Sequence, residues 1–118
     1  MRGKADSRLD TREDDSTYLR AGLQRDLLRK LRRGEWRIQD EADLHGLTAD
    51  EASRLLEDFI DEARQRGLRC VRVVHGKGMG ILKARVRRDL SLRDDVMAYA
   101  EPADALGGSG AVQVLLNG

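Results

Sequence analysis

The stretch CVRVVHGKGMGIL, from Cys70 to Leu82, decides how this 118-residue chain is organised. A run of β-branched residues ends at His75, glycines follow at positions 76, 78 and 80, and a helical pattern begins at Ile81. A strand that stops at a glycine-rich loop and leads into a helix gathers backbone N–H groups at the positive end of a helix dipole, which suits phosphate. Lys77 adds a cation, and His75 adds a group that transfers protons near neutral pH. We therefore predict a phosphate-binding loop with a proton-transfer residue beside it.

A second strand-to-turn pattern lies upstream. Residues 38–44 predict a short strand that ends in Asp43-Leu44-His45-Gly46, and Thr48 with Glu51 forms a capping box for a helix that runs to Gly67. A β–α–β crossover of this length makes its two strands parallel, so both end at one sheet edge. We therefore expect His45, His75 and Asp43 to form one site.

The remaining elements follow from the same kind of pattern. A helix from Ile81 to about Ser91 is predicted to bury Ile81, Leu82, Val86 and Leu90 and to expose Lys83, Arg85, Arg87 and Arg88. Two further strands are predicted, at 96–101 and 111–116. The glycines at 107, 108 and 110 indicate a turn before the last strand.

The N-terminal third is strongly charged. We expect a flexible charged arm at 1–16, a basic amphipathic helix with its linker at 17–37, and a single folded domain at 38–118. Arg29, Arg32 and Arg33 belong to the basic face of that helix, which either is an ordinary solvated surface or grips a polyanion; the phosphate loop favours the second.

Composition limits the class of protein. The chain is 40% hydrophobic, enough for one modest core, and its net charge of +1 hides local patches because 36% of its residues are charged. Its single cysteine, Cys70, is expected to be a core residue. No apolar stretch has the length of a membrane span, so we expect a cytoplasmic protein without a membrane partner.

These motifs together resemble the Smr (small MutS-related) domain. The resemblance covers about Asp40 to Leu116 and rests on the paired motifs Asp43-Leu44-His45-Gly46 and Val74-His75-Gly76-Lys77-Gly78, with a glycine-rich turn at 107–111 before the last strand. The preceding basic segment is similar to the stand-alone bacterial members. The resemblance implies an α/β fold, a two-layer β-α-β-α-β-β sandwich like the C-terminal domain of translation initiation factor 3. It also implies nuclease activity on RNA or DNA and, for the stand-alone members, cleavage of mRNA on stalled or collided ribosomes.

The residue types suggest how RNA would be cut. One group removes the 2′-hydroxyl proton, another protonates the leaving 5′-oxygen, and cations stabilise the charged intermediate. We assign His45 and His75 to acid and base in an order that the sequence leaves open, and Asp43 to orienting a histidine or balancing its charge. The phosphate groups would be held by Lys77 together with the loop glycines Gly76, Gly78 and Gly80. The basic side chains of two helices would add to this binding, namely Lys83, Arg87, Arg88, Arg29, Arg32 and Arg33.

Three alternatives remain beside this hypothesis. The first is a metal held by Asp43, His45 and His75, which ranks lower because Lys77 would repel a cation; we expect no cofactor. The second is a DNA-nicking nuclease. The third is a module that binds nucleic acid or ribosomes without cutting. A small-molecule phosphate enzyme is disfavoured because the loop matches neither GxxxxGK[ST] nor GxGxxG.

Overall fold

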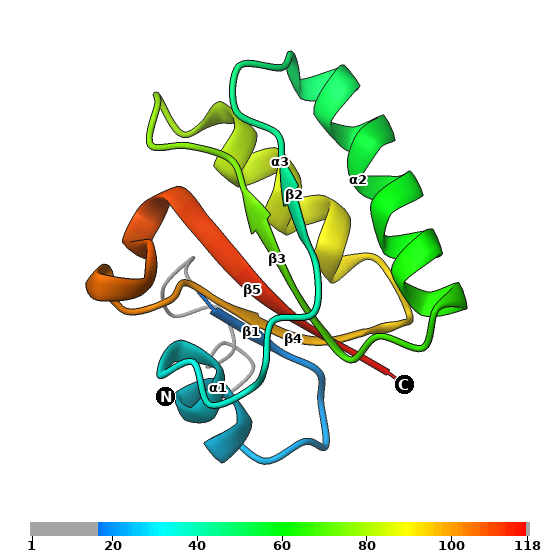
Figure 1. The fold of residues 1–118 in the computed structure, drawn as a ribbon, viewed down its shortest axis with the longest axis vertical. Helices are drawn as coiled ribbons and strands as arrows, with labels where there is room; N and C mark the ends of the chain where they lie inside the picture. The colour runs from blue at the N-terminus through cyan, green and yellow to red at the C-terminus, as the bar shows by residue number, and fades with distance from the viewer. Residues whose placement is uncertain (1–16, 118) are drawn as a thin grey trace, which may run out of the picture.

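The computed structural model describes residues 17–117, which form a mixed five-stranded sheet with helices on both of its faces (Figure 1). The arm expected at 1–16 lies outside the described residues. The elements in chain order are β1 (Thr17–Leu19), α1 (Asp26–Arg32), β2 (Glu41–Asp43), α2 (Ala49–Gln65), β3 (Cys70–Val74), α3 (Ile81–Ser91), β4 (Val96–Ala100), the 3₁₀ turns η2 (Asp104–Leu106) and η3 (Gly108–Gly110), and β5 (Ala111–Leu116).

The order of the strands places the ends of β2 and β3 together. The sheet runs β1-β4-β5-β3-β2, and β2 and β3 are parallel neighbours with Asp43 paired to Val74, as the crossover predicted. The pairs β3–β5, β5–β4 and β4–β1 are antiparallel. Since β4 therefore points the same way as β3, the residues that follow β2, β3 and β4 all lie at one edge of the sheet.

Helix α2 begins and ends where its capping signals predicted. The Thr48 side chain accepts from the Glu51 backbone N–H, and the Glu51 carboxylate accepts from that of Thr48. Gly67, at φ +74, follows the last turn. The buried face of α2, formed by Ala52, Leu56, Ile60 and Ala63, packs on the sheet.

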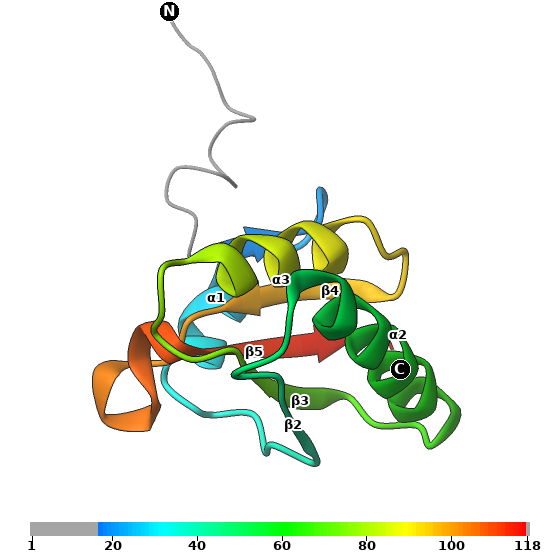
Figure 2. The same cartoon turned by 90° about the horizontal axis from the view of Figure 1, so that it is seen from above.

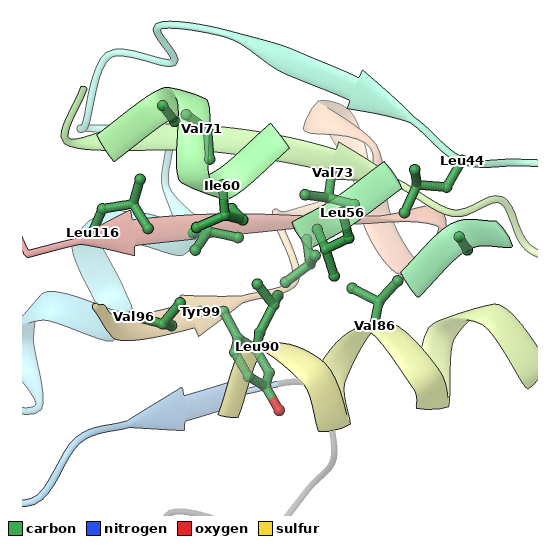
Figure 3. Packing of buried hydrophobic residues seen from close by; sticks show 14 residues of the cluster. Leu44, Leu56, Ile60, Val71, Val73, Val86, Leu90, Val96, Tyr99 and Leu116 are labelled. Atoms are coloured by element: carbon green, nitrogen blue, oxygen red, sulfur yellow. The ribbon is translucent and has the colours of Figure 1, made fainter. Parts of the chain in front are cut away.

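The larger core lies between the sheet and helices α2 and α3 (Figures 2 and 3). Alternate residues of β3 and β5 enter it, for example Val71 and Val73 of β3. In β4 a register shift between Val96 and Ala98 lets both Val96 and Tyr99 face this side. The alternation expected of a sheet covered by helices is thus kept in β3 and β5 and is interrupted once in β4.

A smaller core fills the opposite face, beneath α1. Leu31 of α1 packs there with Cys70, Ala98 and Leu115, and the buried side-chain amide of Gln113 donates to the Leu31 carbonyl oxygen at 2.9 Å. Burial raises the pKa of the Cys70 thiol to about 11, so this cysteine is the core residue that was predicted.

The N-terminal prediction was wrong for residues 17–19, which form strand β1 and not a helix. Leu19 pairs with Ala98 of β4, and Tyr18 stacks on Tyr99 with ring centroids 5.4 Å apart. Gly22, at φ +92, lies in a turn between β1 and α1, and the helix covers only residues 26–32. Leu19 and Leu31 nevertheless share one core, so both apolar positions are buried although only Leu31 lies in a helix.

No helix within residues 17–117 is long and apolar enough to cross a membrane.

Candidate active site

Both histidine motifs lie at the sheet edge where β2 and β3 end. The backbone N–H of Leu44 donates to the Val74 carbonyl oxygen at 2.7 Å, which extends the pairing to the last residue before each histidine. His45 and His75 then line the same pocket, with a cavity volume of about 320 Å³. We call this cavity the histidine pocket. The structure therefore brings the two predicted histidines together.

Asp43 and His45 form a hydrogen-bonded pair. The Asp43 Oδ1 atom lies 2.6 Å from Nδ1 of His45 and also accepts from the His45 backbone N–H at 3.1 Å. These two bonds, the ring bond first, lower the pKa of the Asp43 carboxyl group, so Asp43 is an anion at neutral pH. Because the carboxylate holds Nδ1, Nε2 is the ring nitrogen of His45 that is left for a ligand, on a side chain that is 70% exposed.

His75 has a contrasting environment, because it is only 4% exposed. Its Nδ1 lies 2.8 Å from the Gly76 carbonyl oxygen, which can only accept, so Nδ1 carries the proton and Nε2 is left with a lone pair. Burial lowers the pKa of His75, and the charges of Arg87 and Lys83 lower it further; the Gly76 carbonyl and Glu101 act in the opposite direction. His75 is therefore a neutral imidazole at neutral pH.

The glycine-rich loop differs from the prediction at Gly76. Its backbone N–H donates to the Gly110 carbonyl oxygen at 3.0 Å and is not available to a phosphate. Gly76 instead provides room: its φ is +83, and a Cβ atom there would lie 3.3 Å from Cβ of His45. Within the described part of the chain, the N–H groups of Gly78 and Gly80 have no acceptor, so both are available to a ligand.

Lys77 lies beside a second cavity, of about 290 Å³, which is also lined by Lys83 and Ser109. We call it the serine pocket. The alkyl chain of Lys77 lies over Gly110, where a Cβ atom would be 3.1 Å from its Cγ. Among residues 17–117 no carboxylate comes within ion-pair distance of Lys77, so its charge is available to an anion.

The cations of α3 are less exposed than predicted. Lys83 and Arg87 both bind the Glu101 carboxylate, at 2.6 and 3.0 Å, and Arg85 binds Asp50 at 3.1 Å. Arg88 is the most exposed of the four, although its Nε lies 3.7 Å from a carboxylate oxygen of the neighbouring Asp89. The prediction that all four are exposed was wrong because acidic residues from β4 and α2 reach them. Ile81, predicted to be buried, is 65% exposed.

The basic residues of α1 do not join this site. Arg29 pairs with Asp26 on the helix that covers the opposite face of the sheet, and Arg33 pairs with Glu35 just beyond its end. The end of α1 does approach the η2 turn, since the Ala103 N–H donates to the Arg32 carbonyl oxygen at 3.2 Å. Figures 1 and 2 show α1, the η2–η3 segment and the glycine-rich loop on the same side of the molecule.

A metal centre does not fit the donor geometry. Within residues 17–117, no three His, Cys, Asp or Glu side chains lie close enough together to share a metal ion. The set that the metal alternative requires, Asp43 with both histidines, is thus not arranged as a ligand set.

Sequence reasoning missed Glu101 and Ser109. Glu101 directly follows β4 as His75 follows β3, so the shared direction of these two strands was a signal that could have found it. Ser109 lies in the η3 turn and reaches the site because Gly110 contacts the glycine-rich loop; the sequence contains no signal for that approach.

Comparison with known proteins matches residues 42–117 to the Smr domain. The chain is 38% identical over 99 residues to a protein named ribosome rescue factor SmrB from Tolumonas auensis, covering 84% of this chain and 57% of that relative. The SmrB of Aliivibrio salmonicida is 37% identical over 100 residues, covering 85% and 56%. The chain therefore spans a little over half the length of these curated relatives.

Two solved structures share the fold. The first is YdaL, a stand-alone small MutS-related protein from Escherichia coli, with a TM-score of 0.76, 36% identity, and coverage of 86% of this chain and 82% of that one. The Smr domain of Thermus thermophilus MutS2 gives a TM-score of 0.64 and 38% identity, covering 65% of this chain and 96% of that one. The predicted sandwich is confirmed by both likenesses, and β1 and α1 add a strand and a second covered face to it.

Proposed function

This chain belongs to the Smr domain family, and on that premise we propose that it is an endonuclease that cuts RNA by histidine acid–base chemistry. The observation that carries the proposal is one pocket lined by His45 and His75 in opposite environments, with Lys77 beside them. Two titratable groups of one kind in contrasting surroundings suit one acid and one base.

His75 is the proposed base. Its Nε2 lone pair is available because Nδ1 donates to the Gly76 carbonyl oxygen. Burial, together with the charges of Arg87 and Lys83, keeps the ring neutral at neutral pH, which is the state in which a base works. His75 would take the proton of a 2′-hydroxyl group, whose oxygen then attacks the adjacent phosphorus.

His45 is the proposed acid. Its exposed ring can exchange protons with solvent, and Asp43 orients it through Nδ1 and balances the charge of the protonated ring. His45 Nε2 would give its proton to the 5′-oxygen as the P–O bond breaks. The products would be a 2′,3′-cyclic phosphate and a 5′-hydroxyl end, with no metal required.

Lys77 and the backbone N–H groups of Gly78 and Gly80 would hold the scissile phosphate and stabilise its extra charge. Lys83 and Arg87 lie near this phosphate position, but Glu101 already neutralises much of their charge. We therefore propose that they support the site more than they contact the phosphate, and that Arg88 supplies outer electrostatic attraction.

The relatives suggest where the substrate is found. Because proteins of 34–38% identity are named ribosome rescue factors, we propose mRNA on stalled or collided ribosomes as the substrate and the cytoplasm as the place of action. The exposed basic side chains at the end of α1, Arg29, Arg32 and Arg33, do not line the pocket and would add affinity for RNA backbone without joining the chemistry.

The test is cleavage of end-labelled single-stranded RNA and of matched DNA, with and without EDTA, by wild type and His45→Gln. His45 is exposed, so this variant should keep the wild-type melting temperature while its cleavage rate falls roughly 10²- to 10⁴-fold. A substrate with one 2′-deoxy residue at the cut site should resist cleavage. The same assay on isolated collided ribosomes covers an enzyme that acts only there.

Each rival predicts a different product. Chelator-sensitive cleavage that leaves a 3′-hydroxyl end would establish metal chemistry and overturn the histidine mechanism. Nicked DNA would identify a DNA nuclease. Tight RNA or ribosome binding with no cleavage of any substrate, by wild type and variant alike, would identify a binding module.

A further inference from the structure

An exposed apolar surface adjoins the proposed catalytic pocket. Met79, in the glycine-rich loop, is 95% exposed, and Ile81, at the start of α3, is 65% exposed. They flank Gly80, whose φ of +88 turns the chain so that both residues border the same hollow. Neither residue takes part in the proposed chemistry, although both line the histidine pocket as well.

This hollow has a volume of about 450 Å³ and lies between the beginnings of α2 and α3. We call it the methionine hollow. Its apolar lining comes from Met79 and Ile81 together with Ala49 and Ala84, and its rim carries Arg85 and Arg88. An apolar floor with guanidinium groups at its rim suits a flat, weakly polar ring more than it suits a phosphate.

The rim is partly fixed in place. The Arg85 guanidinium donates to Asp50 at 3.1 Å and to the Ser53 hydroxyl at 3.0 Å, so it is held against α2. Arg88 is largely exposed and is held only by a long, 3.7 Å ion pair with its neighbour Asp89, which a bound ring could displace. Stacking on a fixed guanidinium needs little further ordering of the side chain.

The three cavities adjoin one another around the glycine-rich loop, because they share lining residues. Met79 and Gly80 line all of them, and the histidine pocket shares Lys77 and Lys83 with the serine pocket and Ile81 with the methionine hollow. A strand whose phosphate lies against Lys77 and the two histidines can therefore extend a neighbouring residue into the methionine hollow without leaving the surface.

We propose that the methionine hollow binds the nucleobase next to the scissile phosphate, with Met79 as its principal contact. This proposal rests on the proposed nuclease function and adds a specificity subsite to it. A thioether against an aromatic ring gives a favourable contact, and single-stranded bases are commonly bound by stacking. Because every base has such a face, the subsite selects unstacked, single-stranded RNA and not a sequence.

The test combines a protein change with a substrate change. Wild type, Met79→Ala and Leu92→Ala are compared on single-stranded RNA and on copies in which one residue at a time is abasic. Leu92 is the matched control because it is 72% exposed and apolar but lies at the far end of α3. Methionine–ring contacts predict a loss of roughly 2- to 12-fold in kcat/KM for Met79→Ala on intact RNA.

The two changes should not add. An abasic residue beside the cut should reduce cleavage by wild type by a similar factor. The same substrate should cause no further reduction in cleavage by Met79→Ala, and Leu92→Ala should behave as wild type throughout. In parallel, an uncleavable 2′-O-methyl RNA with 2-aminopurine at that residue should change fluorescence on binding wild type and less on binding Met79→Ala.

The outcomes separate this proposal from the proposed function. If wild type cuts RNA but the abasic residue and Met79→Ala have no effect, or their effects simply multiply, the base subsite is refuted and the nuclease stands. If Met79→Ala weakens binding to ribosomes while the abasic and 2-aminopurine experiments show no change, the hollow contacts protein and the proposal fails. If nothing is cut, the fluorescence measurement still decides whether a base enters the hollow.

Discussion

Replacing Gly76 by alanine tests whether the two histidine motifs form one working site. The backbone of Gly76 is at φ +83, a left-handed conformation that costs a residue with a Cβ atom roughly 1–2 kcal/mol. The new Cβ would also lie 3.3 Å from Cβ of His45, which must give way by a few tenths of an ångström. The variant therefore combines a backbone strain with a small displacement of the proposed acid.

Gly67→Ala is the matched control. Gly67 is at φ +74, so alanine meets nearly the same backbone strain, but nothing lies within 4 Å of the added Cβ. Both variants should lose about 1–2 kcal/mol of unfolding free energy, with melting lowered by about 4 °C per kcal/mol in a chain of this size. Only Gly76→Ala should lose activity.

The expected loss follows from the displacement. Since a misplacement of about 1 Å costs roughly 100-fold in rate, a shift of a few tenths of an ångström should reduce kcat by roughly 3- to 10-fold. Stability would be measured by urea unfolding and activity by single-turnover RNA cleavage. Equal cleavage rates for Gly76→Ala and Gly67→Ala would refute the reasoning, because His45 would then not depend on the space that Gly76 leaves.

Three further perturbations have distinct expected results. The folded pKa of His75 lies below the unfolded value of about 6.5, so just below pH 6.5 the unfolded chain binds a proton that the folded chain does not. The free energy of unfolding should therefore fall as pH drops from about 6.5 toward the lowered pKa, by at most about 1.4 kcal/mol per pH unit. His75→Gln should flatten this part of the stability curve measured by urea unfolding, and an unchanged curve would contradict the assignment. Asp43→Asn keeps an acceptor for the His45 ring but removes the charge, so cleavage should slow by about 10-fold or more while the melting temperature stays constant; a large drop in melting temperature would instead show a structural role. Glu101→Gln leaves Lys83 and Arg87 without their counter-ion, so it should cost about 2 kcal/mol in unfolding free energy. Because Glu101 raises the pKa of His75, its loss should also move the acid limb of the pH–rate profile to lower pH, and an acid limb that did not move would argue against coupling between Glu101 and His75.

The sequence predicted those features that depend on neighbouring residues. Thr48 and Glu51 identify the start of α2 because a capping box is a local arrangement. The single crossover between the motifs sets β2 parallel to β3, and two parallel neighbouring strands must bring His45 and His75 to one edge of the sheet.

What the sequence could not predict depends on contacts between distant segments. The leucine spacing from Leu19 to Leu31 matches a helix, yet Leu19 reaches the same core from a strand that pairs with β4. Likewise, no local sequence pattern predicts that Glu101 pairs with Lys83, or that the backbone N–H of Gly76 donates to the Gly110 carbonyl oxygen. Charge and hydrogen-bond capacity read from the sequence are therefore upper limits on what a ligand can use.

Strand β1 has a consequence for any shortened version of this protein. It covers the hydrogen-bonding edge of β4, and α1 covers the apolar side of Leu115. A fragment confined to residues 42–117 would present β4 as an unpaired edge next to an uncovered apolar face, the combination that favours pairing with a second chain. The first segments of the described chain thus cover a sheet edge and an apolar face that a second chain could otherwise bind, and a shortened version that keeps both covered should begin no later than Thr17.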